Sequence, residues 1–311
     1  MRIATVPDAE WIERVGPVAG VQMRSWDMST PLPDPEIGYA VHPYLTPAAR
    51  VAAVGALPGE RVVQLLTAGY DAHLPHRPET VTLCNAAGVH DAATAEQAVT
   101  LMLAALRGIP EFVHAQQQAT WLPIRMWSGL ADKRVLIVGY GRIGRAIAAR
   151  LTPFEVSLTA VASRARVGDH LVPHVHGMAE LPRLLPHADV VVLVVPLLPT
   201  TRGLVDADFL AAMPAGSLLV NVARGPVVDT EALLAATRTG RLFAALDVTD
   251  PEPLPDGHPL FGAAGVLVSP HVGGATRAFF PRAAALIRSQ LQRYAVGQMP
   301  LHVVAGPRVD S

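Results

Sequence analysis

A glycine-rich turn is the clearest chemical feature of the sequence. Gly139, Gly141 and Gly144 form a G-x-G-x-x-G pattern between the apolar run RVLIV and the helical run IGRAIAARL. The first glycine permits a tight turn, the second lets the backbone approach a pyrophosphate, and the third lets the helix pack closely on the strand. The backbone N–H groups of Arg142 and Ile143, at the start of the helix, would bind the anion. We therefore predict a dinucleotide-binding turn.

The residues after the next predicted strand indicate which nicotinamide cofactor fits. An NAD-selective site ends its second strand with an acid, about twenty residues past the glycines, that binds the ribose 2′-hydroxyl. This chain has no aspartate or glutamate between Glu155 and Asp169, and Ser163, Arg164 and Arg166 lie there instead. A hydroxyl group and two guanidinium groups suit a 2′-phosphate, which an aspartate would repel. The pattern predicts that NADP(H) is preferred, with NAD(H) as the second cofactor.

Strand and helix signals alternate around this turn. Apolar runs typical of buried strands occupy residues 134–139, 158–162, 190–195, 218–222, 243–248 and 266–268. Helical signals lie between them at residues 178–186, 206–213 and 229–240. Continuous apolar strands separated by helices favour a parallel sheet that is covered on both faces.

The first ninety residues repeat this pattern more weakly. Short apolar runs at residues 3–6, 21–24, 39–41, 62–66 and 81–84 predict a smaller α/β sheet. Long helical signals at residues 92–106 and 277–295 flank the central region, and the second of these is expected to pack on the N-terminal sheet. Residues 109–127 contain three glutamines, two tryptophans and two prolines, and we interpret them as a protruding arm.

Composition excludes several classes of protein. Half of the residues are hydrophobic and the net charge is −1, which excludes global disorder and argues against a nucleic-acid or membrane-surface binder. The longest apolar run, residues 190–198, contains a proline and is too short to span a bilayer. One cysteine allows no intramolecular disulfide, and the N-terminus resembles no signal peptide, so we expect a cytoplasmic protein.

A group of histidines raises the question of a metal site. His170, His174 and His176 follow Asp169 in a segment that also contains glycine and proline. A metal needs several convergent ligands, and this segment reads as a loop without a cysteine or paired carboxylates nearby. We therefore predict no metal site.

Four long motifs make the sequence resemble the D-isomer-specific 2-hydroxyacid dehydrogenase family. They are VVLVVPLLPTTRGLV at 191–205, LVNVARGPVVDTEAL at 219–233, LDVTDPEP at 246–253 and SPHVGGAT at 269–276. The resemblance implies two doubly wound parallel-sheet α/β domains. The NAD(P)-binding Rossmann domain would span residues 96–276, and a smaller flavodoxin-like substrate domain would comprise residues 1–95 and 277–311. It also implies a homodimer formed through the nucleotide-binding domain.

The family places an arginine, a glutamate and a histidine beside the nicotinamide, which correspond here to Arg224, Glu252 and His271. Reduction of a 2-oxo acid needs a hydride at the carbonyl carbon and a proton at its oxygen. Histidine titrates near neutral pH, so His271 suits the proton donor and Glu252 would hold its imidazolium form. The guanidinium of Arg224 would bind the substrate carboxylate and polarise the carbonyl oxygen.

The resemblance implies further contacts. For the cofactor these are Asp247 and the Ala223 carbonyl at the nicotinamide amide, Val195 and Pro196 at the adenine, and contacts from His271 and Gly274. For the substrate, the N–H groups of Ala68 and Gly69 would hold its carboxylate. The loop TAGYD at 67–71 has no arginine for a substrate phosphate, so a small, unphosphorylated 2-oxo acid such as glyoxylate or hydroxypyruvate is favoured.

Two other functions remain open at this point. One is a non-enzymatic, nucleotide-sensing regulator of the same superfamily, which would keep the three residues. The other is an NAD-linked dehydrogenase of the formate or phosphite type, although formate enzymes have a glutamine at the position of Glu252.

Overall fold

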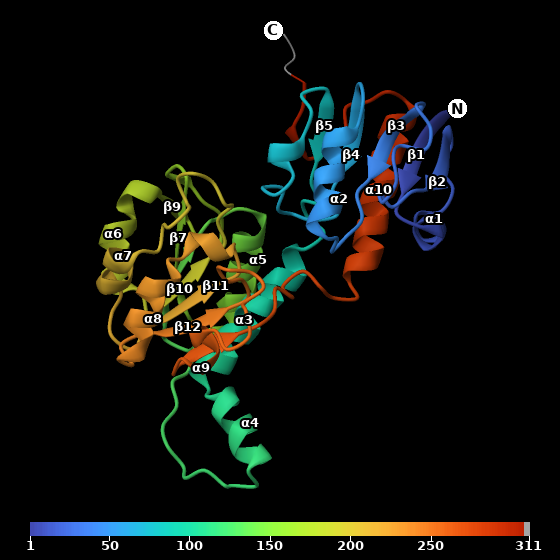
Figure 1. Cartoon of the computed structure of the whole chain (residues 1–311). Coiled ribbons are helices and arrows are strands. Elements are labelled where there is room, and N and C mark those ends of the chain that lie inside the picture. Colours follow the sequence, from blue (N-terminus) through green and yellow to red (C-terminus); the bar gives the residue numbers. More distant parts are fainter. Residues whose placement is uncertain (308–311) are drawn as a thin grey trace. The chain divides into compact units, whose positions relative to one another are not determined.

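The chain forms two compact units, Met1–His90 with the segment from Thr276 onward, and Asp91–Ala275. The structure is a computed structural model that describes residues 1–307 (Figure 1). The predicted boundary between residues 95 and 96 falls inside helix α3, Asp91–Leu106, which belongs entirely to the second unit. Residues 308–311 of the predicted substrate domain lie outside the described residues.

The second unit contains an eight-stranded sheet in the order β13-β12-β11-β10-β6-β7-β9-β8. All neighbouring strands are parallel except β8 and β9, which are antiparallel. The six strands β9-β7-β6-β10-β11-β12 have the order 3-2-1-4-5-6 of a Rossmann fold. The strands are β6 Arg134–Val138, β7 Ser157–Ala162, β8 Arg166–Val167, β9 His174–Gly177, β10 Val190–Leu193, β11 Leu218–Asn221, β12 Phe243–Leu246 and β13 Val266–Val268.

Helices cover both faces of this sheet. The covering helices are α3, α5 Arg142–Leu151, α6 Leu181–Leu184, α7 Ala207–Ala212, α8 Thr230–Arg238 and α9 Pro259–Gly262, and α4 Ile109–Gln117 follows α3. One apolar cluster joins α3 and α5 to the sheet through residues such as Met102 and Ile147, and a second joins α7 and α8 through Leu210 and Leu233. The Asp206 carboxylate caps α7 by accepting the N–H of Phe209 at 2.8 Å, which explains why that helix begins where an acid precedes it.

Two sequence-based expectations for this unit are wrong. The helix expected at residues 178–186 is broken into a 3₁₀ turn at Met178–Glu180, α6, and a 3₁₀ turn at Leu185–His187. A proline at the start of each of the last two pieces removes a backbone donor, so one continuous helix is disfavoured. The histidine segment expected to be a loop contains strand β9, which pairs with β7 and β8.

The first unit is a six-stranded sheet in the order β14-β5-β4-β3-β1-β2. Its first five strands are parallel in the flavodoxin order 2-1-3-4-5, and β14 adds an antiparallel edge. The elements are β1 Arg2–Val6, α1 Ala9–Val15, β2 Val21–Ser25, β3 Ile37–Val41, α2 Ala48–Ala53, β4 Arg61–Gln64, β5 Val81–Cys84, α10 Phe279–Ala295 and β14 Val303–Ala305.

Helix α10 joins the first unit although it comes from the far end of the chain. It packs against α1, where the rings of Trp11 and Phe279 meet edge to face with their centroids 5.8 Å apart. Strand β5 ends at Cys84, whose side chain is fully buried, and this burial raises the pKa of the thiol to about 12. The N-terminal strands β1 and β2 and the C-terminal elements α10 and β14 thus belong to the same unit.

Helix α4 and residues 118–129 project from the second unit (Figure 1). The segment after α4 has little regular structure, and the side chains of Trp121, Ile124 and Met126 are 93%, 97% and 98% exposed. Among residues 1–307 no single helix is long and apolar enough to cross a membrane. Only α3 and α4 taken together meet that test, and they are bent by 65° at their junction.

Candidate active site

The glycine turn follows β6 and precedes α5. The local environment explains the presence of glycine differently at each of its three positions. Gly139 has a φ of +111°, and a Cβ there would lie 2.7 Å from the Val194 carbonyl. A Cβ on Gly144 would lie 2.1 Å from the carbonyl oxygen of Gly139. A Cβ on Gly141, however, would meet no atom of the described chain within 4 Å. The fold itself therefore requires the first and third glycines, and the open space over Gly141 fits an approaching pyrophosphate.

The segment after β7 carries the cationic residues predicted to distinguish the cofactors. Ser163 and Arg164 are exposed in the turn that follows β7. Arg166 lies in β8, and its guanidinium donates to the carbonyl oxygen of Tyr140, inside the glycine turn, at 2.6 Å. This contact fixes a positive charge beside the dinucleotide turn. Ser163, Arg164 and Arg166 therefore all lie in the segment that follows the second strand, and their contact with a 2′-phosphate stays a prediction.

Asp169 is the nearest acid after this segment, and its carboxylate is already engaged by other groups of the unit. It accepts the hydroxyl of Tyr140 at 3.0 Å and the N–H groups of Leu171 and Val172 at 3.0 and 3.1 Å. It also forms an ion pair with Arg145 at 2.9 Å. These contacts use most of the acceptor capacity of a carboxylate. Asp169 is therefore poorly suited to bind ribose hydroxyls.

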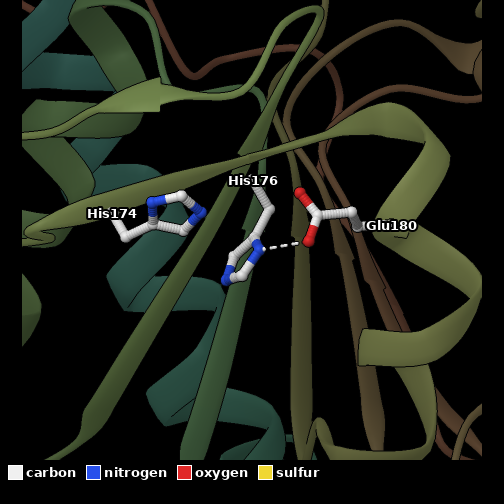
Figure 2. A group of neighbouring side chains, drawn as sticks. All are labelled: His174, His176 and Glu180. Atoms are coloured by element: carbon white, nitrogen blue, oxygen red, sulfur yellow. Dashed lines mark hydrogen bonds and ion pairs between the residues drawn. The ribbon is translucent and has the colours of Figure 1, made fainter.

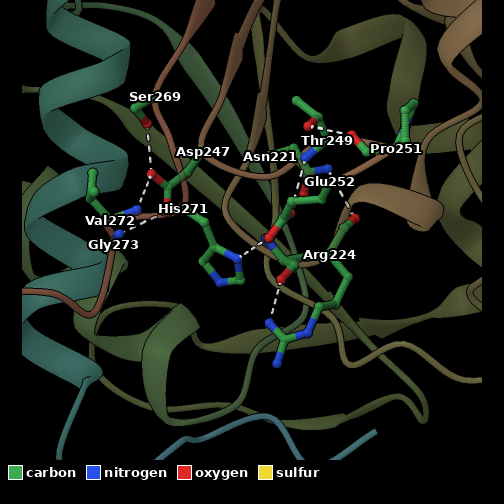
Figure 3. Close-up of polar contacts among 11 residues, drawn as sticks. Asn221, Arg224, Asp247, Thr249, Pro251, Glu252, Ser269, His271, Val272 and Gly273 are labelled. Carbon is green, nitrogen blue, oxygen red and sulfur yellow. Dashed lines mark hydrogen bonds and ion pairs between the residues drawn. The ribbon is translucent and has the colours of Figure 1, made fainter. Parts of the chain in front are cut away.

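The three predicted catalytic residues follow three neighbouring strands of the sheet. Arg224 comes after β11, Glu252 after β12 and His271 after β13. Figure 3 shows the three side chains converging, with the Nδ1 atom of His271 2.5 Å from the Oε1 atom of Glu252. Burial raises the pKa of Glu252, but the hydrogen bond and charge of His271 lower it, and the pKa ends below its ordinary value. The pair is thus a carboxylate that holds an imidazole at the carboxyl edge of the sheet.

The backbone at His271 adopts an uncommon conformation. Its φ is +52°, in the left-handed region, which costs a residue other than glycine about 1 kcal/mol or more. The N–H of His271 donates to the carbonyl oxygens of Asp247 at 2.8 Å and Ser269 at 3.1 Å, and these bonds hold the turn. A strained conformation that is retained at a reactive side chain is typical of functional sites.

The Asp247 side chain supports the same turn. It is 3% exposed, and its carboxylate accepts the Ser269 hydroxyl at 2.6 Å and the N–H groups of Val272 and Gly273 at 3.0 and 2.8 Å. Gln97 of α3 donates to both Asp247 and Ser269. These contacts give Asp247 a positioning role for the segment that carries His271, whereas its contact with a nicotinamide amide stays a prediction.

The turn that carries Arg224 is fixed in a similar way. The Asn221 amide group donates to the Arg224 carbonyl at 3.1 Å and accepts the Ala223 N–H at 3.0 Å. A Cβ on Gly225 would lie 1.7 Å from the carbonyl oxygen of Thr249, so only glycine lets the two loops approach. The Ala223 carbonyl, predicted to meet the nicotinamide amide, accepts a hydrogen bond from the Arg224 guanidinium at 2.7 Å.

The remaining predicted cofactor residues lie at the same edge of the sheet. Val195 and Pro196 follow β10, which neighbours β6 in the sheet, and Gly274 follows β13 beyond His271. Arg142 is the first residue of α5, and its side chain forms an ion pair with Asp91 at 2.9 Å. Its backbone N–H is therefore the group that could bind the cofactor at the turn. Bound cofactor contacts at these positions stay predictions.

The predicted substrate residues Ala68 and Gly69 belong to the first unit, after β4. Their carbonyl groups are held in place, since the Asn85 amide donates to Ala68 at 2.7 Å and the Thr67 hydroxyl donates to Gly69 at 2.6 Å. These bonds fix the orientation of the loop backbone. The sequence-based reasoning did not identify Asn85, Gln97 or Asn221, because a polar residue that supports a loop carries no local pattern.

Comparison with known proteins identifies the family of the chain. Residues 99–273 match the family model of the D-isomer specific 2-hydroxyacid dehydrogenase NAD binding domain. A glyoxylate reductase/hydroxypyruvate reductase of Mus musculus is 36% identical over 224 residues, which cover 70% of this chain and 68% of that protein. The match therefore extends beyond the nucleotide-binding unit.

Two solved structures are similar over nearly the full length. A D-isomer specific 2-hydroxyacid dehydrogenase from Xanthobacter autotrophicus Py2, in complex with NADPH and MES, is 32% identical with a TM-score of 0.78, covering 98% of this chain and 99% of that one. An NADPH-dependent glyoxylate/hydroxypyruvate reductase from Sinorhizobium meliloti, in complex with NADP and malonate, is 26% identical with a TM-score of 0.77, covering 98% and 97%. The chain thus belongs to the D-isomer-specific 2-hydroxyacid dehydrogenase family and is an NAD(P)-dependent oxidoreductase.

Proposed function

We propose that the enzyme reduces a small 2-oxo acid, such as glyoxylate or hydroxypyruvate, to the D-2-hydroxy acid with NADPH. The observation that carries this proposal is the His271–Glu252 pair beside Arg224, at the carboxyl ends of adjacent strands in a Rossmann unit. Open α/β sheets bind their ligands at that edge. Relatives that are named glyoxylate or hydroxypyruvate reductases support the substrate class.

The chemistry divides among three side chains. When bound, the reduced nicotinamide supplies a hydride to the carbonyl carbon. His271, held through Nδ1 by Glu252, donates the Nε2 proton to the carbonyl oxygen and takes it back in the reverse direction. The Glu252 carboxylate compensates the charge of the imidazolium. The Arg224 guanidinium binds the substrate carboxylate and polarises the carbonyl oxygen.

The cofactor preference follows from the end of the second strand. Ser163, Arg164 and Arg166 offer a hydroxyl and two positive charges to a 2′-phosphate, and the Asp169 carboxylate is paired with Arg145. We expect a preference for NADPH over NADH of at least about tenfold in kcat/KM, which corresponds to about 1.4 kcal/mol. The NADPH and NADP complexes of the two structural relatives support this choice.

A panel of 2-oxo acids assayed with both NADPH and NADH tests the proposal. We expect turnover of glyoxylate or hydroxypyruvate, faster with NADPH, and slower turnover of phosphohydroxypyruvate. The Arg164→Ala variant should lose most of the NADPH preference and keep its activity with NADH. Arg202→Ala, which removes another exposed arginine of the same unit, is the matched control. Equal use of both cofactors by the wild type, or an unchanged ratio in the Arg164 variant, would count against the assignment.

The exposed arm supports a second proposal, a homodimer formed through the nucleotide-binding unit. Trp121, Ile124 and Met126 are almost fully exposed, and apolar side chains gathered on one projecting segment mark interfaces. We expect a dimer by light scattering at micromolar concentration, and a monomer for the variant with Trp121 and Met126 both changed to Asp. Val167→Asp, at an equally exposed position outside the arm, should remain dimeric. A monomeric wild type would refute the proposal.

A further inference from the structure

Strand β9 places two histidines on one face of the sheet. Side chains two positions apart in a strand point to the same side, so His174 and His176 are neighbours. Their ring centroids lie 4.5 Å apart and the ring planes meet at 82°. Figure 2 shows the His176 ring between the His174 ring and the carboxylate of Glu180. This arrangement brings two imidazoles and one carboxylate together at the edge of the second unit, away from the strand ends that carry the catalytic pair.

Glu180 holds one of these rings in a defined orientation. Its Oε2 atom lies 2.9 Å from Nδ1 of His176 and also accepts a hydrogen bond from Arg183 at 2.8 Å, while Oε1 accepts the N–H of Gly177 at 3.1 Å. Because Nδ1 is engaged by the carboxylate, Nε2 is the ring nitrogen of His176 that is left to bind an ion. A carboxylate on the rear nitrogen of a histidine is the arrangement that orients metal-binding histidines.

The distances suit a single cation. One potential ligand atom from each of His174, His176 and Glu180 lies within 4.8 Å of the other two. An ion about 2 Å from each imidazole nitrogen spans donors separated by roughly 3 to 4 Å, so small rotations of the two histidine side chains bring both rings to one ion. Imidazole nitrogen favours zinc, copper and nickel ions over magnesium and calcium, which prefer oxygen. A purely structural His–Glu pair would not need the second histidine ring.

Contrary to the prediction from the sequence alone, we propose that His174, His176 and Glu180 form a binding site for one divalent transition-metal ion such as Zn²⁺ or Cu²⁺. The two imidazoles are the ligands, Glu180 orients His176 and offsets the charge of the ion, and water completes the coordination. The bound ion would link β9 to the Met178–Glu180 turn that follows it. This site takes no part in hydride transfer and does not depend on the proposed substrate.

Calorimetric titration of the untagged, metal-stripped full-length protein with ZnCl₂ tests the site. We expect the wild type to bind an ion that His174→Ala and His176→Ala each bind at least about tenfold more weakly, and that Glu180→Gln binds about tenfold more weakly. His187→Ala, which removes another exposed histidine of the same unit, should bind like the wild type. CuCl₂ should bind more tightly than ZnCl₂, and MgCl₂ should not compete.

Folding and catalysis provide the internal checks. The histidine variants should keep wild-type circular dichroism and wild-type rates of 2-oxo acid reduction, since neither residue lies at the catalytic pair. Zinc should raise the melting temperature of the wild type and leave that of His176→Ala unchanged, because an ion stabilises only the state that binds it. Absence of zinc binding by the wild type, or wild-type affinity in the His174 and His176 variants, would overturn the proposal.

Discussion

The second unit contains two histidine–glutamate pairs of nearly the same geometry. Nδ1 of His271 lies 2.5 Å from Glu252, and Nδ1 of His176 lies 2.9 Å from Glu180. Each glutamate is also influenced by an arginine, and the pKa of each lies below its ordinary value. A histidine–carboxylate contact by itself therefore does not identify a catalytic group.

The surroundings distinguish the two pairs. Glu180 caps a helical turn, and its oxygens already accept the Gly177 N–H and the Arg183 guanidinium, while His176 has the regular backbone of a strand. His271 instead has a left-handed backbone at the carboxyl edge of the sheet, with 47% of its side chain exposed. Position in the fold and backbone strain, rather than the contact itself, distinguish the proposed catalytic pair from the pair of the proposed metal site.

The largest difference between the pairs is expected when each histidine is removed. His271→Ala should lower kcat for the best 2-oxo acid on the order of a hundredfold or more, because the general acid is lost. His176→Ala should leave kcat unchanged, because this ring contacts Glu180 and not the proposed catalytic pair. Steady-state kinetics with NADPH measure both. Near wild-type turnover by the His271 variant would remove it from the mechanism.

Removal of the two arginines should give the next largest contrast. Arg224→Ala should lower kcat/KM roughly thirtyfold, about 2 kcal/mol, because a charged hydrogen bond to the substrate carboxylate is lost. Arg183→Ala should have no measurable effect on the same parameter, because this side chain contacts only Glu180 among the groups discussed. A loss in the Arg183 variant as large as that in the Arg224 variant would contradict the division of roles.

Neutralising each glutamate should produce a smaller difference in catalysis. Glu252→Gln keeps the shape of the side chain but removes the charge that holds the imidazolium, so kcat should fall about tenfold, or 1.4 kcal/mol. Glu180→Gln should retain the wild-type rate. The pH–rate profiles of both variants provide the measurement, since only the Glu252 variant should change the shape of the profile. An unaltered profile for Glu252→Gln would show that its charge is not used.

The pH dependence of stability should be the smallest effect, and here both pairs should behave alike. Each glutamate has a lowered pKa in the folded state, so its stabilisation is present above the unfolded value of 4.5 and is lost as the pH falls through the folded value. The free energy of unfolding of Glu252→Gln should differ from the wild type by less than about 1 kcal/mol near pH 7, since the site is partly exposed. Urea denaturation should show a smaller difference in unfolding free energy between Glu252→Gln and the wild type near pH 4 than near pH 7. A difference that increases as the pH falls would contradict a lowered pKa of Glu252 in the folded state.

Much of the nucleotide-binding unit could be predicted from the sequence. Its buried parallel strands are continuous apolar runs, so β6, β10 and β11 begin at the predicted residues and end within two residues of the predicted ends. Strands β8 and β9 escaped prediction because they are short and polar. His271 and Glu252 could be proposed as catalytic residues because long motifs surround them. The interaction between His176 and Glu180 depends on strand β9, which the sequence did not indicate.

The first unit shows where such prediction stops. Its strands were recognisable, but its residues for substrate selection lie in loops whose conformation depends on contacts such as Asn85 with the Ala68 carbonyl. In the second unit, Gln97 of α3 likewise supports Asp247 and Ser269, which lie far from it in the sequence. These contacts join residues far apart in the sequence, and no local spacing encodes them. The identity of the 2-oxo acid that the enzyme prefers is therefore the property that the sequence predicts least well.

The burial of Cys84 has a practical consequence for the handling of this enzyme. The thiolate is the reactive form of cysteine, and a pKa of about 12 leaves almost none of it at neutral pH. Cys84 is also the chain's one cysteine, so the folded protein offers no thiol to oxidants or alkylating reagents. Its reaction with a thiol reagent would then report the opening of the β5 region, and the kinetics of labelling would measure how often the first unit unfolds.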